Sequence, residues 1–257
     1  MEAISSLIPP IPEADAAPSC ADRLRAEADY YNTLQGSLAG YDCSKCKNRG
    51  YITVIRGREL VTKQCSCMKT RETLRRIRES GLEELLREFK FSTYETPEIW
   101  QQTLKETVQS FVKSDAVGLF LGGQTGCGKT HLCTAAVGYF IKQGMSARYF
   151  VWREDSVILK GYINDTEYAA LIGSYKHTDV LYIDDLFKGG ATDADKKLAF
   201  ELIDYRCRNK LRTLISTELT EEELIGTDEA LAGRIFRMSK GFRLMIPKDR
   251  RKNYRLR

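Results

Sequence analysis

Apolar and polar positions alternate along most of the chain in a way that predicts helices and strands in turn. Between residues 98 and 257, short apolar runs are separated by longer stretches with helical spacing. The runs predict five strands, at Val117–Leu121, Ala147–Trp152, Val180–Ile183, Thr213–Ser216 and Arg243–Ile246. The longer stretches predict helices at Glu98–Val112, Lys129–Gln143, Ser156–Tyr175, Ala194–Arg208 and Ala230–Met238, plus a short one begun by a Thr220–Glu223 capping box. This order predicts an α/β fold whose parallel sheet carries helices on both faces.

The N-terminal part of the chain has a different pattern. Residues 1–20 hold four of the six prolines and predict a flexible, Pro-rich arm without the features of a targeting signal. Residues 21–92 combine two polar helical stretches with a cysteine-rich section between them, and Gly81 interrupts the second stretch. We therefore expect an N-terminal module over residues 21–92 and a second domain over residues 98–257.

Composition narrows the class of protein. The chain has 257 residues, of which 42% are hydrophobic, and this is too much apolar material for a disordered protein. No run approaches the roughly 18 apolar residues of a membrane-spanning helix, so we expect no membrane association. Without an export signal the protein is expected in the cytoplasm, where its eight cysteines stay reduced or bind metal.

A phosphate-binding loop follows the first strand of the second domain. Its residues match the pattern G-x-x-x-x-G-K-[ST] and are Gly123, Gln124, Thr125, Gly126, Cys127, Gly128, Lys129 and Thr130. The glycines let the backbone turn around phosphates, and the helix that follows directs its positive dipole end at them. Lys129 is expected to reach the β- and γ-phosphates, and Thr130 to supply a hydroxyl to Mg²⁺.

A second motif supports nucleotide binding. The apolar strand at Val180–Ile183 ends in Asp184, which is expected to hold Mg²⁺ directly or through water, and Asp185, which is expected to activate the attacking water. This strand is the third in chain order, so one strand should separate it from the phosphate-loop strand in the sheet. That arrangement resembles the AAA+ and RecA-like ATPases. A Ras-like GTPase would need N-K-x-D, whereas the residues at 209–212 end in Arg212, so ATP is expected.

The AAA+ resemblance implies two further roles. A polar residue at the end of the fourth strand senses the γ-phosphate in AAA+ proteins, and here Thr217 or Ser216 could do so, although Glu218 stands where relatives often have Asn. Arg234 and Arg237 share one face of a helix before the last strand. In an AAA+ ring this helix points at the neighbour's ATP, so the resemblance implies an arginine finger there and a homo-oligomer on ATP binding.

Four cysteines predict a metal site. Cys43 and Cys46 form a C-x-x-C, and Cys65 and Cys67 form a C-x-C. The apolar runs between the two pairs, with Gly57 at their centre, predict a β-hairpin that returns the second pair to the first. Four thiolates can bind Zn²⁺ tetrahedrally, and a redox pair is the alternative. The other cysteines are not expected to be metal ligands.

Together these features resemble the DnaC/DnaI-type helicase loaders, which are AAA+ proteins. The resemblance rests on three motifs: G-Q-T-G-C-G-K-T-H-L at 123–132, L-Y-I-D-D-L at 181–186 and G-R-I-F-R-M at 233–238. The first motif adds His131 to the nucleotide-binding stretch. It implies that residues 1–90 hold a hexameric replicative helicase. It further implies an ATPase that delivers this helicase onto single-stranded DNA, with the helical lid of most AAA+ proteins missing or minimal.

Charge is consistent with a nucleic-acid partner. The net charge is +5, and residues 234–257 contain ten Lys or Arg and one acid. Four cations there could contact the phosphates of single-stranded DNA: Lys248, Arg250, Arg251 and Lys252. Tyr254 or Phe242 could stack on bases. A solvated surface is the plainer interpretation. Two other functions stay open: an IstB-like ATPase that assists a transposase, and an adaptor that binds ATP and DNA but scarcely hydrolyses ATP.

Overall fold

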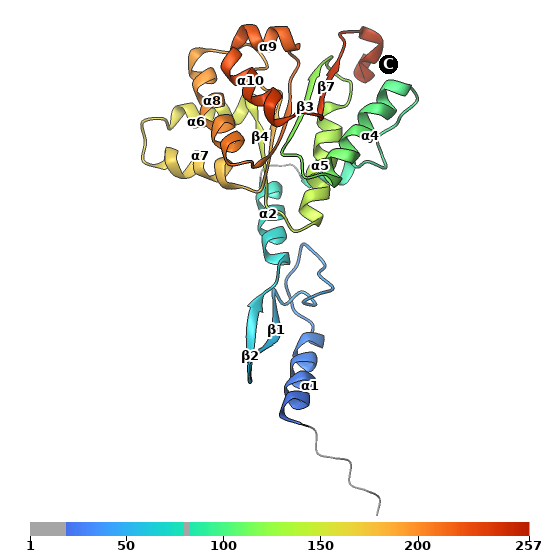
Figure 1. Cartoon of the computed structure of the whole chain (residues 1–257), viewed down its shortest axis with the longest axis vertical. Coiled ribbons are helices and arrows are strands. Elements are labelled where there is room, and N and C mark those ends of the chain that lie inside the picture. Colours follow the sequence, from blue (N-terminus) through green and yellow to red (C-terminus); the bar gives the residue numbers. More distant parts are fainter. Residues whose placement is uncertain (1–18, 80–82, 257) are drawn as a thin grey trace, which may run out of the picture. The chain divides into compact units, whose positions relative to one another are not determined.

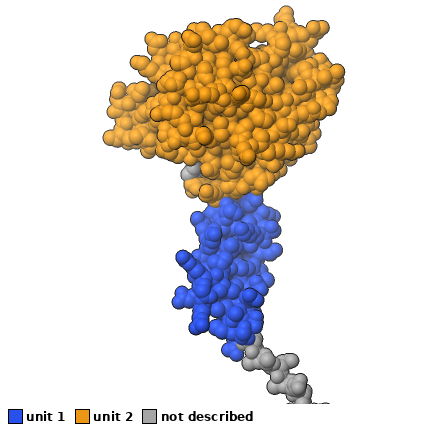
Figure 2. Space-filling view, viewed as in Figure 1, with its two compact units in different colours: residues 1–68 blue, residues 69–257 orange. Residues whose placement is uncertain are grey.

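The computed structural model describes residues 19–79 and 83–256, so most of the expected Pro-rich arm, and Gly81, lie outside the described residues. The chain divides into two compact units, residues 1–68 and residues 69–257, which Figure 2 colours separately. Each unit has its own core. Among the described residues, no helix is both long enough and apolar enough to cross a lipid bilayer.

Unit 1 contains a helix and the expected β-hairpin. Helix α1 (Cys20–Thr33) begins at a Ser19 cap, and strands β1 (Tyr51–Arg56) and β2 (Glu59–Gln64) pair antiparallel. The side chain of Asn32 in α1 exchanges two hydrogen bonds of 2.8 Å with the backbone of Thr53 in β1. The hairpin is the one that the sequence predicts, and these hydrogen bonds connect it to α1.

The segment between the cysteine-rich section and the sheet belongs to unit 2. Helix α2 (Cys67–Glu79) begins in unit 1, and α3 (Glu83–Glu88) follows it. Leu74, Leu85 and Leu86 pack against the core of unit 2. Because of these apolar contacts, the boundary between the units lies earlier in the chain than the expected one near residues 91–96.

Unit 2 is a five-stranded parallel sheet in the order β4-β5-β6-β3-β7. The strands are β3 (Gly118–Gly123), β4 (Ala147–Val151), β5 (Val180–Asp184), β6 (Arg212–Ser216) and β7 (Arg243–Ile246). The α-helices from the start of the sheet onward are α4 (Ile99–Lys113), α5 (Lys129–Lys142), α6 (Trp152–Gly161), α7 (Glu167–His177), α8 (Asp193–Arg208), α9 (Glu221–Thr227) and α10 (Glu229–Met238). Two 3₁₀ turns, η2 (Arg250–Lys252) and η3 (Tyr254–Leu256), follow β7.

Helices cover both faces of the sheet, which confirms the expected fold class. Side chains on strand β3 alternate between two cores: Leu119 and Leu121 pack with α4 and α5, and Phe120 packs with α8 and α10. Figure 1 shows α4 and α5 on one side of the sheet and α6, α8 and α10 on the other. A strand buried on both faces reads as a continuous apolar run, which is why the sequence identified these strands.

Sheet order brings the two nucleotide motifs together. Strand β6 lies between β3 and β5, so one strand separates the phosphate-loop strand from the acidic strand, as predicted. All three strands run in the same direction. Their carboxyl ends, at Gly123, Asp184 and Ser216, therefore meet at one edge of the sheet, which is where ligands bind in open α/β sheets.

Candidate functional site

The phosphate loop connects β3 to the N-terminus of α5. Its glycines at 123, 126 and 128 all have positive φ, and a Cβ on Gly128 would lie only 2.5 Å from the ring of Tyr94. Lys129 is the first residue of α5, and its buried ammonium donates to the carbonyls of Gly123 at 2.8 Å and Gln124 at 2.7 Å. The loop therefore curls around the lysine at a helix N-terminus, an arrangement suited to phosphate.

Asp184 is the centre of a hydroxyl network at the end of β5. Its Oδ1 accepts from Thr130 Oγ1 at 3.2 Å and from the hydroxyls of Tyr182 and Ser216 at 2.5 Å each. Its Oδ2 accepts from the Tyr149 hydroxyl at 2.5 Å. These donors come from β4, β5, β6 and α5, so the carboxylate ties four elements together. The sequence indicated Asp184 and Thr130, but gave no signal for the two tyrosines.

Burial keeps the two tyrosines protonated. Burial first, and the charge of Asp184 second, raise the pKa of Tyr149 and that of Tyr182. Both phenols therefore stay neutral and donate to the carboxylate across the physiological range. Hydrogen bonds to a carboxylate favour its charged form, so the network holds a negative charge beside the Thr130 hydroxyl.

Thr130 and Asp184 fit a magnesium ion. Mg²⁺ prefers hard oxygen ligands such as hydroxyl and carboxylate, and the distance between Thr130 Oγ1 and Asp184 Oδ1 is 3.2 Å. A carboxylate offers about four lone-pair positions, and three hydroxyls already occupy Oδ1. These hydrogen bonds therefore favour binding of Mg²⁺ through Asp184 Oδ2 or through a water molecule.

Asp185 is paired with a lysine. The turn after β5 is strained, because Asp185 and Phe187 have φ values of 56° and 61°. Asp185 Oδ2 lies 2.6 Å from Lys188 Nζ, and the same ammonium lies 3.0 Å from Glu218 Oε1. Partial burial opposes the charge of Lys188, but hydrogen bonds to the two carboxylates raise its pKa. Asp185, the candidate base, is thus held in an ion-pair network with Lys188 and Glu218.

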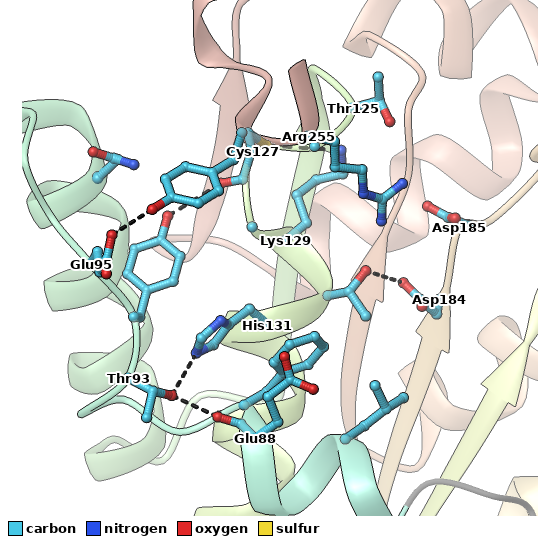
Figure 3. A pocket seen from close by; sticks show the side chains of 18 of the residues that line it. Glu88, Thr93, Glu95, Thr125, Cys127, Lys129, His131, Asp184, Asp185 and Arg255 are labelled. Carbon is cyan, nitrogen blue, oxygen red and sulfur yellow. Dashed lines mark hydrogen bonds between the residues drawn. The ribbon is translucent and has the colours of Figure 1, made fainter. Parts of the chain in front are cut away.

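Lys129, Thr130, Asp184 and Asp185 line one cavity of about 770 Å³, a volume that suits a nucleotide. Three parts of unit 2 form its walls: the phosphate loop with Asp184 and Asp185, the segment 85–95, and the residues after β7 (Figure 3). Glu218 also lines the cavity. Sequence patterns identified only the first of these walls.

His131 connects the phosphate loop to the segment 85–95. Its ring stacks on Phe89 with centroids 4.7 Å apart, and Nε2 lies 2.9 Å from the Lys90 carbonyl and 3.3 Å from Thr93 Oγ1. Burial lowers the pKa of His131, so the neutral ring is favoured. The residue lines the cavity, and its contacts show that it also positions the cavity wall.

Three expected site residues lie away from the cavity. The buried Thr217 hydroxyl donates to the Leu186 carbonyl at 2.8 Å, and Thr217 does not line the cavity. Ser216 instead reaches Asp184, and Glu218 faces the phosphate loop. Arg234 and Arg237 lie on α10, where Arg234 pairs with Asp204 and Arg237 is exposed. Neither arginine lines the cavity of its own chain, and a role in a neighbour's site stays a prediction.

The four expected zinc ligands form one cluster in unit 1. Their sulfur atoms all lie within 4.8 Å of one another, with Cys43 and Cys65 3.8 Å apart and Cys46 and Cys67 3.5 Å apart. A tetrahedral zinc with Zn–S bonds of about 2.3 Å would place sulfurs about 3.8 Å apart. The cysteines therefore fit a zinc module, and the predicted return of the second pair is confirmed.

The local backbone stabilises the thiolate form of Cys46. The Gly50 N–H points at Cys46 Sγ at 3.4 Å, and Asn48 turns the loop by accepting from the Cys43 N–H at 2.9 Å. Burial opposes a charge on Cys46, but the Gly50 N–H and the neighbouring thiols lower its pKa to about 6. Cys67 begins helix α2, whose positive end also favours thiolates.

Several of the expected DNA-contacting residues after α10 contact other parts of unit 2. Phe242 packs against Phe111 at the core, and the Tyr254 hydroxyl bonds to Glu95 while its ring stays exposed, so base stacking by Tyr254 stays a prediction. Lys248 pairs with Glu223 and Arg251 with Asp249. The physical reason is that this segment packs onto the phosphate loop.

Comparison with known proteins identifies relatives of most of the chain. A family model described as IstB-like ATP binding protein matches residues 48–236. Over 228 residues the chain is 32% identical to the phage-like element PBSX protein XkdC of Bacillus subtilis (strain 168), covering 82% of this chain and 85% of that protein. The matched residues include the phosphate loop, the acidic strand and half of the cysteine cluster.

Solved structures match at the level of the fold. The crystal structure of the DnaC helicase loader has a TM-score of 0.56 at 22% identity, covering 63% of this chain and 97% of that chain. The crystal structure of DnaI has a TM-score of 0.55 at 21% identity, covering 64% of this chain and 92% of that chain. The resemblance expected from the three sequence motifs is therefore confirmed.

Proposed function

We propose that this chain, which belongs to the family of IstB-like ATP binding proteins, is an ATP-hydrolysing loader of a replicative DNA helicase. The observation that carries the ATPase part is the meeting of Lys129, Thr130 and Asp184 around one cavity. The helicase part is supported by the fold shared with the DnaC helicase loader and by a cysteine module that precedes the ATPase unit.

Four residues of the cavity have roles in the proposed hydrolysis. Lys129 and the loop N–H groups bind and orient the β- and γ-phosphates. Thr130 and Asp184 would hold Mg²⁺, which supplies charge stabilisation on the phosphate oxygens when bound. Asp185 would orient the attacking water and take its proton once its Oδ2 separates from Lys188.

A neighbouring copy would complete the site. Arg237 is exposed on α10 and, among the described residues, donates only to the Cys207 sulfur at 3.4 Å, whereas Arg234 is ion-paired with Asp204 and packs over Phe200 with its guanidinium carbon 4.3 Å from the ring centroid. An arginine finger needs a side chain that is free to reach the γ-phosphate of another chain. We therefore assign the finger to Arg237, and we expect homo-oligomers to form on ATP binding.

Zinc in unit 1 would be structural. Four cysteine ligands leave no open coordination position for a substrate, which is the pattern of structural zinc sites. A stable module of this kind can present a surface to a protein partner. We assign the helicase contact to the N-terminal part of the chain and single-stranded DNA to the ATPase unit.

Native mass spectrometry of the full chain with the host's hexameric replicative helicase and ATP tests this function. A complex containing a helicase hexamer is expected, and the Cys46→Ser variant should lose it while still binding ATP. The Cys20→Ser variant is the matched control, because Cys20 is exposed and lies outside the cluster. Absence of any helicase complex, together with self-assembly on DNA, would favour the transposase-helper function instead.

A further inference from the structure

Two carboxylates share one lysine on the wall of the cavity. Lys188 Nζ lies 2.6 Å from Asp185 Oδ2 and 3.0 Å from Glu218 Oε1. Asp185 directly follows β5, and Glu218 comes two residues after the end of β6. All three residues line the cavity, and their side chains are 27–36% exposed. The lysine can therefore neutralise only one of the two carboxylates at a time, at the place where hydrolysis is proposed to occur.

The backbone places Lys188 next to Asp185. The Lys188 N–H donates to the Asp185 carbonyl at 2.9 Å, so the main chain and the side chain of the lysine both contact the aspartate. The Asp185 N–H donates to Ser216 Oγ at 3.0 Å, which connects the aspartate to β6. Gly189 and Gly190 follow with positive φ, and a Cβ at either would meet open space among the described residues. The packing therefore leaves the segment after Lys188 room to move while Asp185 keeps its place.

Glu218 connects this ion pair to the phosphate loop. Partial burial opposes the charge of Glu218, but hydrogen bonds from Lys188 and from Thr125 lower its pKa. The carboxylate is therefore ionised near neutral pH and accepts from both residues. Thr125 belongs to the phosphate loop, so the loop and the candidate base are joined through Glu218 and Lys188. A change in the loop on nucleotide binding can reach Asp185 through these contacts.

We infer that Lys188 is a positioning residue that restrains Asp185, and that Glu218 binds the lysine when the base is released. A carboxylate paired with an ammonium is a weaker proton acceptor than a free one, so this pairing slows activation of the attacking water. Transfer of the ammonium to Glu218 leaves Asp185 Oδ2 free to approach the water. This inference rests on the proposed ATP hydrolysis and adds two residues that lie outside the phosphate loop and the acidic strand.

Steady-state phosphate release by the full chain tests the inference, with kcat and KM for ATP measured separately. Lys188→Met keeps the apolar stem but removes the charge, so kcat should rise about fivefold, the factor that one partly exposed ion pair supplies. KM should stay near the parent's value, because the lysine acts on the base. Glu218→Gln should lower kcat by a similar factor, because Asp185 is then the only carboxylate left in the network.

The double variant separates this role of Glu218 from a direct one. If Glu218 acts only through Lys188, adding Glu218→Gln to Lys188→Met should leave kcat unchanged. If Glu218 contacts the water or the γ-phosphate itself, the same substitution should lower kcat in both backgrounds, and the inference is wrong.

Lys196→Met is the matched control. Lys196 lies 3.8 Å from Asp193 with the same spacing in the chain, and neither residue lines the cavity. Its kcat should equal the parent's. Equal kcat values for Lys188→Met and Lys196→Met would overturn the inference while the ATPase function stands. A raised KM for Lys188→Met with an unchanged kcat would mean that the lysine only binds nucleotide, and would also overturn it.

Other variants show where a failure lies. Lys129→Ala should abolish hydrolysis, and unchanged hydrolysis in this variant, or none in any protein, would remove the ATPase function together with the inference. A parental kcat in Asp185→Asn would show that Asp185 is not the base, which also overturns the inference. Lys188→Met is expected to melt with the parent, and a lower melting temperature together with a lower kcat would mean that the lysine only supports the fold.

Discussion

Replacing Cys46 by serine should release zinc and unfold unit 1 while the ATPase unit stays folded. The Cys46 side chain is 1% exposed, its sulfur lies 3.5 Å from that of Cys67, and it accepts the Gly50 N–H. A serine hydroxyl stays protonated near neutral pH and cannot replace a thiolate ligand. The variant therefore leaves only three thiolate ligands for zinc.

The expected loss of stability is large because unit 1 has little other core. Its described buried apolar side chains are Ala28 and the cysteines 46, 65 and 67. A structural zinc contributes about 10–16 kcal/mol of binding free energy to a small module near pH 7. Whole domains are stable by only about 5–15 kcal/mol. Even a fraction of the zinc contribution therefore decides whether unit 1 folds.

The chain offers separate reporters for the two units. Both tryptophans, Trp100 in α4 and Trp152 in α6, belong to unit 2, so tryptophan fluorescence follows the ATPase unit alone. A thiol reagent follows unit 1, because bound zinc would protect the four clustered cysteines. Cys46→Ser should expose the three remaining cluster thiols at once, with fluorescence unchanged, and Cys20→Ser should keep the cluster protected.

Three results would refute this reasoning. Metal analysis of freshly purified parent protein could give well under one zinc per chain. Cys46→Ser could keep its thiols protected, which would mean that packing alone holds the cluster. Loss of the tryptophan signal in Cys46→Ser would show that the ATPase unit depends on unit 1 for its fold.

Three other predictions concern the ATPase unit. Arg237→Ala should lower ATP hydrolysis by about 10³-fold in the assembled protein and leave ATP binding unchanged, which steady-state turnover measures. Arg234→Ala should mainly lower the stability of the fold, by about 1 kcal/mol, because its ion pair is lost, and thermal melts measure this change. Burial lowers the pKa of His131, so the unfolded chain takes up the proton first and stability should fall as pH drops below the ordinary value of about 6.5; His131→Gln should melt with less dependence on pH there. Gly128→Ala should abolish ATP binding in a nucleotide titration, because the residue has a φ of 91° and its Cβ would lie 2.5 Å from the Tyr94 ring.

The sequence predicted those parts of the fold whose causes are local. The strand runs, the phosphate loop and the Thr220 capping box each depend on residues close together in the chain, and all three are confirmed. The stretch 156–175, expected to be mostly helical, forms parts of α6 and α7 on either side of a break at residues 162–166. The cysteine cluster was also predictable, because a hairpin returns its own ends to each other.

Contacts between distant segments were not predictable in the same way. Tyr149 reaches Asp184 only because β4 pairs with β5, and Tyr254 reaches Gly126 only because β7 pairs with β3. The packing of the residues after β7 against the phosphate loop was not predictable from their charge, because composition reports charge but not the surface that the charge faces. Side chains at the end of β6 posed a similar problem, because a shift of one residue along a strand exchanges the two faces. The sequence left Thr217 and Ser216 as alternatives, and in the structure Ser216 reaches Asp184 whereas Thr217 donates to the Leu186 carbonyl.

Geometry of the cavity separates ATP binding from ATP hydrolysis. A single chain already contains Lys129, Thr130 and Asp184 in contact with one cavity, so it can bind a nucleotide without a partner. Its candidate base is held by Lys188, and Arg237, the proposed arginine finger, does not line its own chain's cavity. Under the proposed function, hydrolysis would therefore require a change that binding does not, namely release of Asp185 and arrival of another chain's α10. Such a protein would keep its ATP until it is assembled, as the proposed loading of a helicase onto DNA would require.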